Sequence, residues 1–166
     1  MKILKQLVSS LALLLSLSLA LSGCDGDNGA SSGGSGGGKG GSVIGTWKYK
    51  DAVGFAHTIT FKSDGVFETT TEGKLMSKGR YSVSGNTITD TTTHIHGDMY
   101  AALGLSSKWY SEAEFKSALS AKGVPESFFT ENMGMVFLPE EVIFSISGNK
   151  MTATKVGGDT VVYTRA

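Results

Sequence analysis

A series of short segments with alternating apolar and polar residues most constrains what this chain can fold into. In the first segment, Val43, Trp47 and Tyr49 share one parity, which is the period of a strand with one buried face. Ser63-Asp64-Gly65 and Gly85-Asn86 are typical of tight hairpin turns, where glycine and asparagine tolerate positive φ. The sequence therefore predicts eight strands: Val43–Lys50, His57–Lys62, Val66–Thr71, Lys74–Ser84, Thr87–His96, Val142–Ser147, Lys150–Lys155 and Thr160–Arg165.

Hairpin connections between neighbouring strands favour one architecture. Antiparallel strands in sequential order avoid exposed edges when the sheet closes on itself. We therefore expect an all-β fold, an eight-stranded antiparallel up-and-down barrel with a helical insertion between the fifth and sixth strands. A barrel of this size is either filled by side chains or holds one small ligand.

Two motifs at the ends of the predicted barrel carry a family resemblance. Gly45-Thr46-Trp47 opens the first strand, and Tyr163-Thr164-Arg165 closes the last. Together with the hairpin at 61–65, they resemble the lipocalins and related calycin-type barrels, in particular the small lipocalin-like domains of bacterial lipoproteins. The resemblance implies that Arg165 packs over Trp47 beside Gly45 and closes one barrel end. The chain departs from animal lipocalins in lacking their disulfide and their late Thr-Asp-Tyr motif.

The segment from about 97 to 140 is too long for an ordinary strand connection. Ser111 and Glu114 fit a capping box, Gly123 fits a helix stop, and Pro125 fits the start of a second helix ending near Met133. The segment is rich in apolar residues, including Phe128 and Phe129. We expect it either to plug or cover one barrel end or to act as a mobile lid.

The N-terminus has the pattern of an exported lipoprotein. Lys2 and Lys5 precede a leucine-rich run, and Leu21-Ser22-Gly23-Cys24 resembles a bacterial lipobox. The resemblance implies cleavage before Cys24, the only cysteine, and a covalent diacylglyceryl and N-acyl lipid on that residue; the alternative is an ordinary signal peptide. Residues 1–23 are then a signal peptide. We expect no other cofactor, and a lipid anchor to the bacterial envelope membrane with the domain facing the periplasm or the cell exterior.

Residues 24–42 comprise the expected lipidated cysteine and a tether rich in glycine and serine, which cannot form a core. The remaining residues, 43–166, form the predicted barrel domain. Without Lys2 and Lys5 the chain has 13 basic and 15 acidic residues, a formal charge of −2. This balance leaves no basic patch that would indicate nucleic-acid binding.

One cluster has metal-ligand character. His94 and His96 share a strand face if alternation is strict, and Asp98 follows closely. If Ile88 faces inward, both histidines face inward too and could meet His57 in the lumen. The simpler interpretation is a pair of exposed histidines at a strand end.

No motif indicates catalysis, since no serine or cysteine nucleophile has a recognisable neighbouring base. We therefore expect a non-enzymatic module that binds a small hydrophobic ligand. The alternative is a packed barrel that binds or inhibits an envelope protein. The expected ligand contacts, chosen by strand parity and aromatic character, are Trp47, Tyr49, Phe61, Tyr81, Phe128 and Phe129.

Overall fold

The computed structural model describes residues 42–166, so Cys24, the signal segment and nearly all of the tether lie outside the described residues. The described part contains nine strands, two α-helices and two 3-10 helices. The strands are β1 (Gly45–Lys50), β2 (Ala56–Phe61), β3 (Val66–Thr71), β4 (Lys74–Ser84), β5 (Thr87–His96), β6 (Trp109–Ser111), β7 (Glu140–Ser147), β8 (Lys150–Lys155) and β9 (Thr160–Arg165). The helices are η1 (Gly97–Leu103), α2 (Glu112–Ala121), α3 (Glu126–Asn132) and η2 (Gly134–Phe137).

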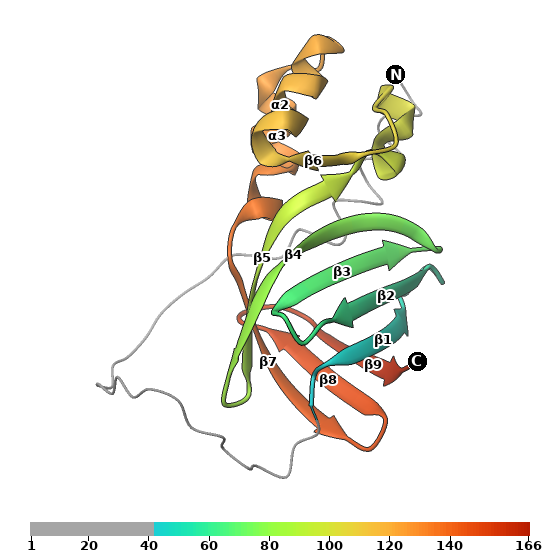
Figure 1. The fold of residues 1–166 in the computed structure, drawn as a ribbon, viewed down its shortest axis with the longest axis vertical. Coiled ribbons are helices and arrows are strands. Elements are labelled where there is room, and N and C mark those ends of the chain that lie inside the picture. The colour runs from blue at the N-terminus through green and yellow to red at the C-terminus, as the bar shows by residue number, and fades with distance from the viewer. Residues whose placement is uncertain (1–41) are drawn as a thin grey trace, which may run out of the picture. The chain divides into compact units, whose positions relative to one another are not determined.

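Eight of the strands close into an antiparallel barrel, as the hairpin order predicts (Figure 1). The hydrogen-bonded order runs from β4 through β3, β2, β1, β9, β8 and β7 to β5, and a further β4–β5 pairing closes the ring. The β1–β9 seam is short, because its recorded pairs are only Trp47 with Arg165 and Lys48 with Thr164. The ninth strand, β6, was not predicted; it pairs with the far end of β5 outside the ring.

The barrel core lies at one end. Its buried members are Val43, Trp47, Phe61, Phe67, Ile88 and Met151. Each comes from a different strand or strand start at the end where the chain enters β1, so the apolar faces of the alternating strands meet there. We call this end the base and the opposite end, where the 51–55 loop and the insertion lie, the mouth.

A β-bulge changes the outcome for the predicted histidine face. In the β4–β5 ladder, Lys78 pairs with His94 but Gly79 pairs with Thr92, which leaves Thr93 as an extra residue. An extra residue reverses the alternation beyond it. As a result Ile95 is buried at 2% exposure. The expectation that His94 and His96 face inward with Ile88 is therefore wrong, because strict alternation ends at the bulge.

Residues 97–139 form a small subdomain with its own core on the far ends of β4 and β5. The capping box is present, since the Ser111 hydroxyl accepts from the Glu114 amide and the Glu114 carboxylate accepts from the Ser111 amide. Gly123, with a φ of 75°, follows α2 as expected. The buried apolar side chains of this subdomain are Leu105, Tyr110, Phe115, Leu119, Phe129 and Met133.

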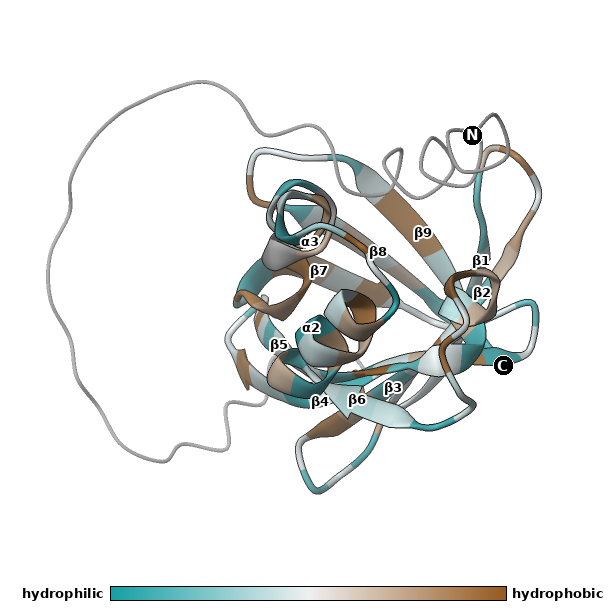
Figure 2. Ribbon diagram, turned by 90° about the horizontal axis from the view of Figure 1, so that it is seen from above, coloured by the Kyte–Doolittle hydropathy of each residue, from teal (hydrophilic) through white to brown (hydrophobic). Residues whose placement is uncertain are grey.

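Seen from above, α2 and α3 lie toward β5 and β7, while β1, β2 and β9 lie away from them (Figure 2). The main contacts of the insertion with the barrel are those of η1 with β4 and of α2, β6 and η2 with β5. The buried aromatic residues of the insertion thus pack mainly on one another and on these two strands. That the insertion plugs or covers a barrel end, or acts as a mobile lid, stays a prediction.

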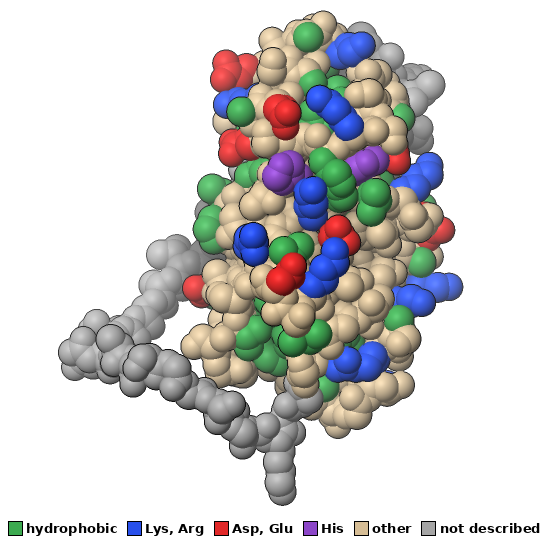
Figure 3. All heavy atoms as spheres, in the orientation of Figure 1, with side chains coloured by type: hydrophobic (Ala, Val, Ile, Leu, Met, Phe, Trp, Pro, Cys, Tyr) green, Lys and Arg blue, Asp and Glu red, His purple; other side chains and the backbone are tan. Residues whose placement is uncertain are grey.

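Basic and acidic side chains are intermingled on the face shown in Figure 3. This mixture agrees with the near-neutral composition and with the absence of a basic stripe in the sequence. No helix within residues 42–166 is long and apolar enough to cross a membrane.

Candidate functional site

The base is closed by the contact that the resemblance implies. The Arg165 guanidinium carbon lies 4.2 Å from the Trp47 ring centroid, and the Trp47 side chain is fully buried. Arg165 also donates from Nη1 to the Ile44 carbonyl at 3.0 Å and from Nη2 to the Ser42 carbonyl at 2.7 Å. Gly45 permits this approach, because a Cβ at that position would lie 2.7 Å from Nη1. The base is therefore a closed end and not an entrance.

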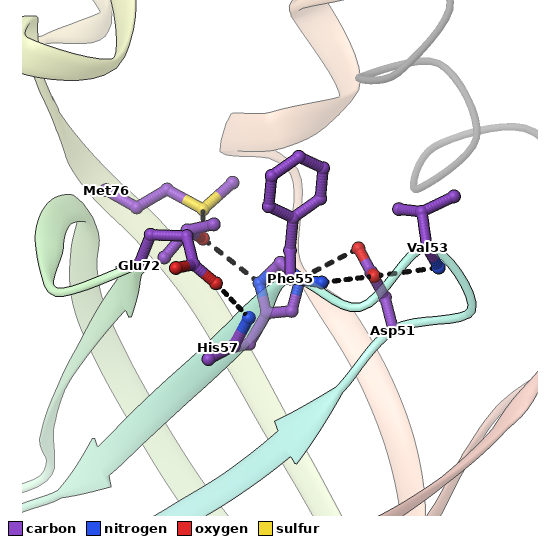
Figure 4. Close-up of polar contacts among 8 residues, drawn as sticks. Asp51, Val53, Phe55, His57, Glu72 and Met76 are labelled. Atoms are coloured by element: carbon purple, nitrogen blue, oxygen red, sulfur yellow. Dashed lines mark hydrogen bonds and ion pairs between the residues drawn. The ribbon is translucent and has the colours of Figure 1, made fainter.

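The mouth carries a chain of hydrogen bonds centred on His57 (Figure 4). Its Nε2 lies 3.1 Å from Asp51 Oδ2, and its Nδ1 lies 3.0 Å from Thr71 Oγ1. Partial burial opposes ionisation of Asp51, but hydrogen bonds from His57 and from the backbone of Phe55 and Val53 outweigh it and hold the pKa of Asp51 below its usual value. The ionised Asp51 can only accept, so His57 Nε2 carries a proton.

A carboxylate, an imidazole and a hydroxyl joined in this order also occur in the active sites of enzymes that use a hydroxyl nucleophile. Here, however, Asp51 accepts hydrogen bonds from the amides of Val53 and Phe55 and so shapes the β1–β2 loop. The Thr71 hydroxyl also contacts Met76 Sδ at 3.3 Å. These contacts give the hydrogen bonds among Asp51, His57 and Thr71 a structural role at the rim of the barrel.

Tyr49 extends the polar groups from the rim into the barrel. Its ring stacks on His57 with centroids 4.6 Å apart, and it meets Tyr163 edge-on with centroids 4.9 Å apart. Burial, with a smaller contribution from Asp51, raises the pKa of Tyr49. Burial also raises the pKa of Tyr163, and the charges of Glu140 and Asp90 add to the increase. Both phenols therefore remain neutral donors at ordinary pH.

Across the barrel, Asp90 of β5 pairs in register with Glu140 of β7. Asp90 has the inward parity of the buried Ile88, and no register shift separates the two residues. Burial and, to a smaller extent, the charge of Glu140 raise the pKa of Asp90 to about 7, although Lys155 partly opposes the shift. Lys155 forms an ion pair with Glu140. This side of the mouth thus brings together two carboxylates and one ammonium group.

The mouth half of the barrel wall is less tightly packed than the base. On β7 the side chains alternate between half-buried and exposed, so even the inward-facing Val142 and Phe144 are not fully buried. Tyr163 and Val161 on β9 follow the same pattern. In a barrel filled with side chains, inward residues would be fully buried. The inward side chains of the mouth half, such as Val142 and Val161, therefore remain partly accessible to solvent.

The structure divides the six expected ligand contacts among three places. Trp47 and Phe61 lie in the packed base, with exposures of 0% and 3%, and Tyr81 packs against them. The Tyr81 hydroxyl donates to the Lys62 carbonyl at 2.7 Å, also at the base. Phe128 and Phe129 belong to the insertion subdomain. Of the six, only Tyr49 lies in the mouth.

The metal-ligand cluster is not assembled around one point. His94 and His96 lie on the face of β5 opposite to that of Ile95, and His96 is buried there, edge-on against Trp109 with 4.8 Å between centroids. The interpretation of two exposed histidines is therefore wrong for His96. Asp98 Oδ2 lies 3.3 Å from His96 Nδ1, and His94 Nδ1 bonds to Thr93. Within residues 42–166, no group of three His, Cys, Asp or Glu side chains is arranged to hold a metal ion. His57 is engaged with Asp51 and Thr71 instead.

Two open hollows lie on the surface. One of about 540 Å³ lies between β5, α2 and η2. Another of about 490 Å³ lies at the β1–β9 seam; Tyr49, His57 and Val162 are among its lining residues. The second hollow coincides with the part of the seam beyond Lys48, where no β1–β9 pair is recorded. The mouth residues Tyr49 and His57 thus line a hollow that is open to the surface.

Sequence reasoning missed Asp90, Glu140, Lys155 and Tyr163 as a group. The strand parity of Asp90 was visible, since it follows the apolar Ile88 at the same parity. A charged residue at the parity of an apolar inward residue was the available signal. The partners could not be found in this way, because they come from β7, β8 and β9, and their proximity depends on barrel register.

Comparison with known proteins finds no relative: no family model, no curated protein and no solved structure matches this chain. The closed eight-stranded barrel is consistent with a lipocalin-like fold.

Proposed function

We propose that this protein is a lipid-anchored, non-enzymatic module of the bacterial envelope that binds one small amphipathic ligand in the mouth half of its barrel. The observation that carries the proposal is the contrast between the two ends of the barrel. The base is packed and closed by Arg165, whereas inward side chains near the mouth, such as Val142 and Val161, keep partial exposure. Ligand sites have this mixture of apolar walls and a few convergent polar groups.

The ligand contacts differ from those expected from parity alone. Tyr49, Val142, Phe144 and Tyr163 supply the walls, and His57 and Asp90 supply polar groups. Trp47 and Phe61 support the floor of the site instead of touching the ligand, because both are buried in the base core.

Native mass spectrometry of protein purified gently from its host tests this proposal. A bound small molecule that the Tyr163→Ala substitution removes would support it, with Val162→Ala on the outer face of the same strand as the control. Bare protein, together with failure to retain any added amphiphile, would contradict it. That result would favour the alternative of an envelope interaction protein acting through its surface.

Anchoring is tested separately. The lipobox resemblance at Leu21–Cys24 supports a thioether-linked lipid on Cys24. Two or three acyl chains on one residue hold a protein firmly at a membrane, whereas one chain binds only marginally. Cys24→Ala should move the protein from the membrane fraction to the soluble fraction; equal membrane recovery of both forms would refute the anchor.

A further inference from the structure

The lumen of the mouth half contains a carboxylate without a partner. Within residues 42–166, the Asp90 carboxylate forms no hydrogen bond or ion pair with another side chain, although Glu140 and Lys155 both act on it electrostatically. Its side chain is half-buried and has the inward parity of Ile88. Burying a charge without a partner is costly, so such a group is either a liability or a place that a ligand completes.

The neighbours of Asp90 leave a single negative charge. Glu140 is already paired with Lys155, so the carboxylates of Asp90 and Glu140 and the ammonium of Lys155 together carry a charge of −1 when all are ionised. Three tyrosines lie on the inner face, Tyr81 on the neighbouring strand β4 and Tyr49 and Tyr163 on β1 and β9. Burial is the largest cause raising the pKa of each, so all three stay neutral.

Aromatic rings stand on the other side of the lumen. Tyr163 is close enough to Asp90 for the carboxylate to influence its ionisation, and Tyr49 meets Tyr163 edge-on. The faces of tyrosine rings attract cations, by about 0.5–2 kcal/mol depending on desolvation. A carboxylate opposite two tyrosines, above apolar walls, is complementary to an ammonium group carried on a short apolar chain.

We propose that the ligand of the barrel mouth is a cationic amphiphile, an alkylamine whose ammonium group pairs with Asp90 beside the packed Tyr49–Tyr163 pair. This inference rests on the proposed lumen-binding function and names the ligand class. The same geometry disfavours an anionic amphiphile such as a fatty acid, because its carboxylate would face the residual negative charge of Asp90 and Glu140.

Three probes with the same chain and different head groups test the charge preference: hexylammonium, 1-hexanol and hexanoate. Each is titrated by calorimetry against the full chain as produced in cells, with a protein-free sample of the same lipid and buffer as the blank. We expect hexylammonium to bind at least about 10-fold more tightly than hexanol, equivalent to about 1.4 kcal/mol, and hexanoate more weakly than either.

The matched variants are Asp90→Asn and Asp159→Asn. Both remove one negative charge near the mouth, but Asp159 lies in the exposed β8–β9 turn. Asp90→Asn should abolish the preference for hexylammonium over hexanol, and Asp159→Asn should preserve it within about twofold. Equal affinities for hexanol and hexylammonium in the wild type, or an unchanged preference in Asp90→Asn, would overturn the inference while leaving lumen binding intact. Failure of all three probes would overturn both.

The wild type supplies a second readout that needs no variant. The pKa of Asp90 is near 7, so its ionised fraction rises about 10-fold between pH 6 and pH 8. The affinity for hexylammonium, which stays charged throughout, should rise by the same factor, whereas that for hexanol should not rise. A pH-independent affinity for hexylammonium would contradict pairing with Asp90.

Discussion

Replacing Gly45 by alanine should disrupt the closed base of the barrel. Gly45 has a φ of 127°, and an added Cβ would lie 2.7 Å from Arg165 Nη1. The guanidinium would have to move away from the Ile44 and Ser42 carbonyls and from the Trp47 ring. The substitution therefore imposes backbone strain and displaces the arginine as well.

The magnitude follows from these two costs. A non-glycine residue in a sparsely populated region costs about 1–3 kcal/mol. Displacing the arginine adds about 1–2 kcal/mol for the cation–π contact and its partly exposed hydrogen bonds. We expect Gly45→Ala to lower the free energy of unfolding by about 3–4 kcal/mol, a large part of the stability of a domain this size.

Urea unfolding followed by tryptophan fluorescence measures this change, because Trp47 lies at the affected contact. Gly148→Ala is the control: its φ is 59° and nothing lies within 4 Å of its added Cβ, so only a backbone cost of about 1–2 kcal/mol remains. In an Arg165→Ala background there is no guanidinium to displace, so Gly45→Ala should impose only the backbone strain. Its cost in free energy of unfolding should then be about 1–2 kcal/mol lower than in the wild type. Strict additivity of Gly45→Ala and Arg165→Ala would refute the argument.

Three further predictions concern the mouth and the insertion. Asp90 binds its proton up to about pH 7 in the folded state and releases it near pH 4 when unfolded, so its contribution to stability falls as pH rises from 4 to 7. Asp90→Asn should therefore remove about 2 kcal/mol of the difference between the free energies of unfolding measured by denaturation at pH 5 and pH 7.5. The same difference in the variant and the wild type would contradict the burial of Asp90. Ser111→Ala should cost about 1 kcal/mol by removing the cap of α2, as measured by thermal unfolding against Ser117→Ala on the exposed face of the same helix; equal effects would argue against the cap. Zinc titration should give the same affinity for the wild type and His94→Ala, because His94, His96 and Asp98 do not converge; a loss of high-affinity binding in the variant would show that they do.

The sequence alone determined the eight barrel strands and their closure. Alternation and Gly-Asn turns are local properties, so each hairpin could be read without knowledge of the rest of the chain, and antiparallel neighbours without edges leave a barrel as the favoured arrangement. The same local chemistry predicted the capping box at Ser111 and the stop at Gly123. The Trp47–Arg165 contact was accessible only through the resemblance, since the two residues lie at opposite ends of the domain.

The tertiary structure decided what the inner faces contain. The bulge at Thr93 turned His94 and His96 outward, and no local pattern distinguishes an extra residue from a regular strand position. Closure of the ring brought Asp90, Glu140, Lys155 and Tyr163 together from four strands, because register between distant strands depends on the packing of the whole barrel. The same closure placed Trp47 and Phe61 in a packed base and left Tyr49 at the mouth, although all three share the inward parity.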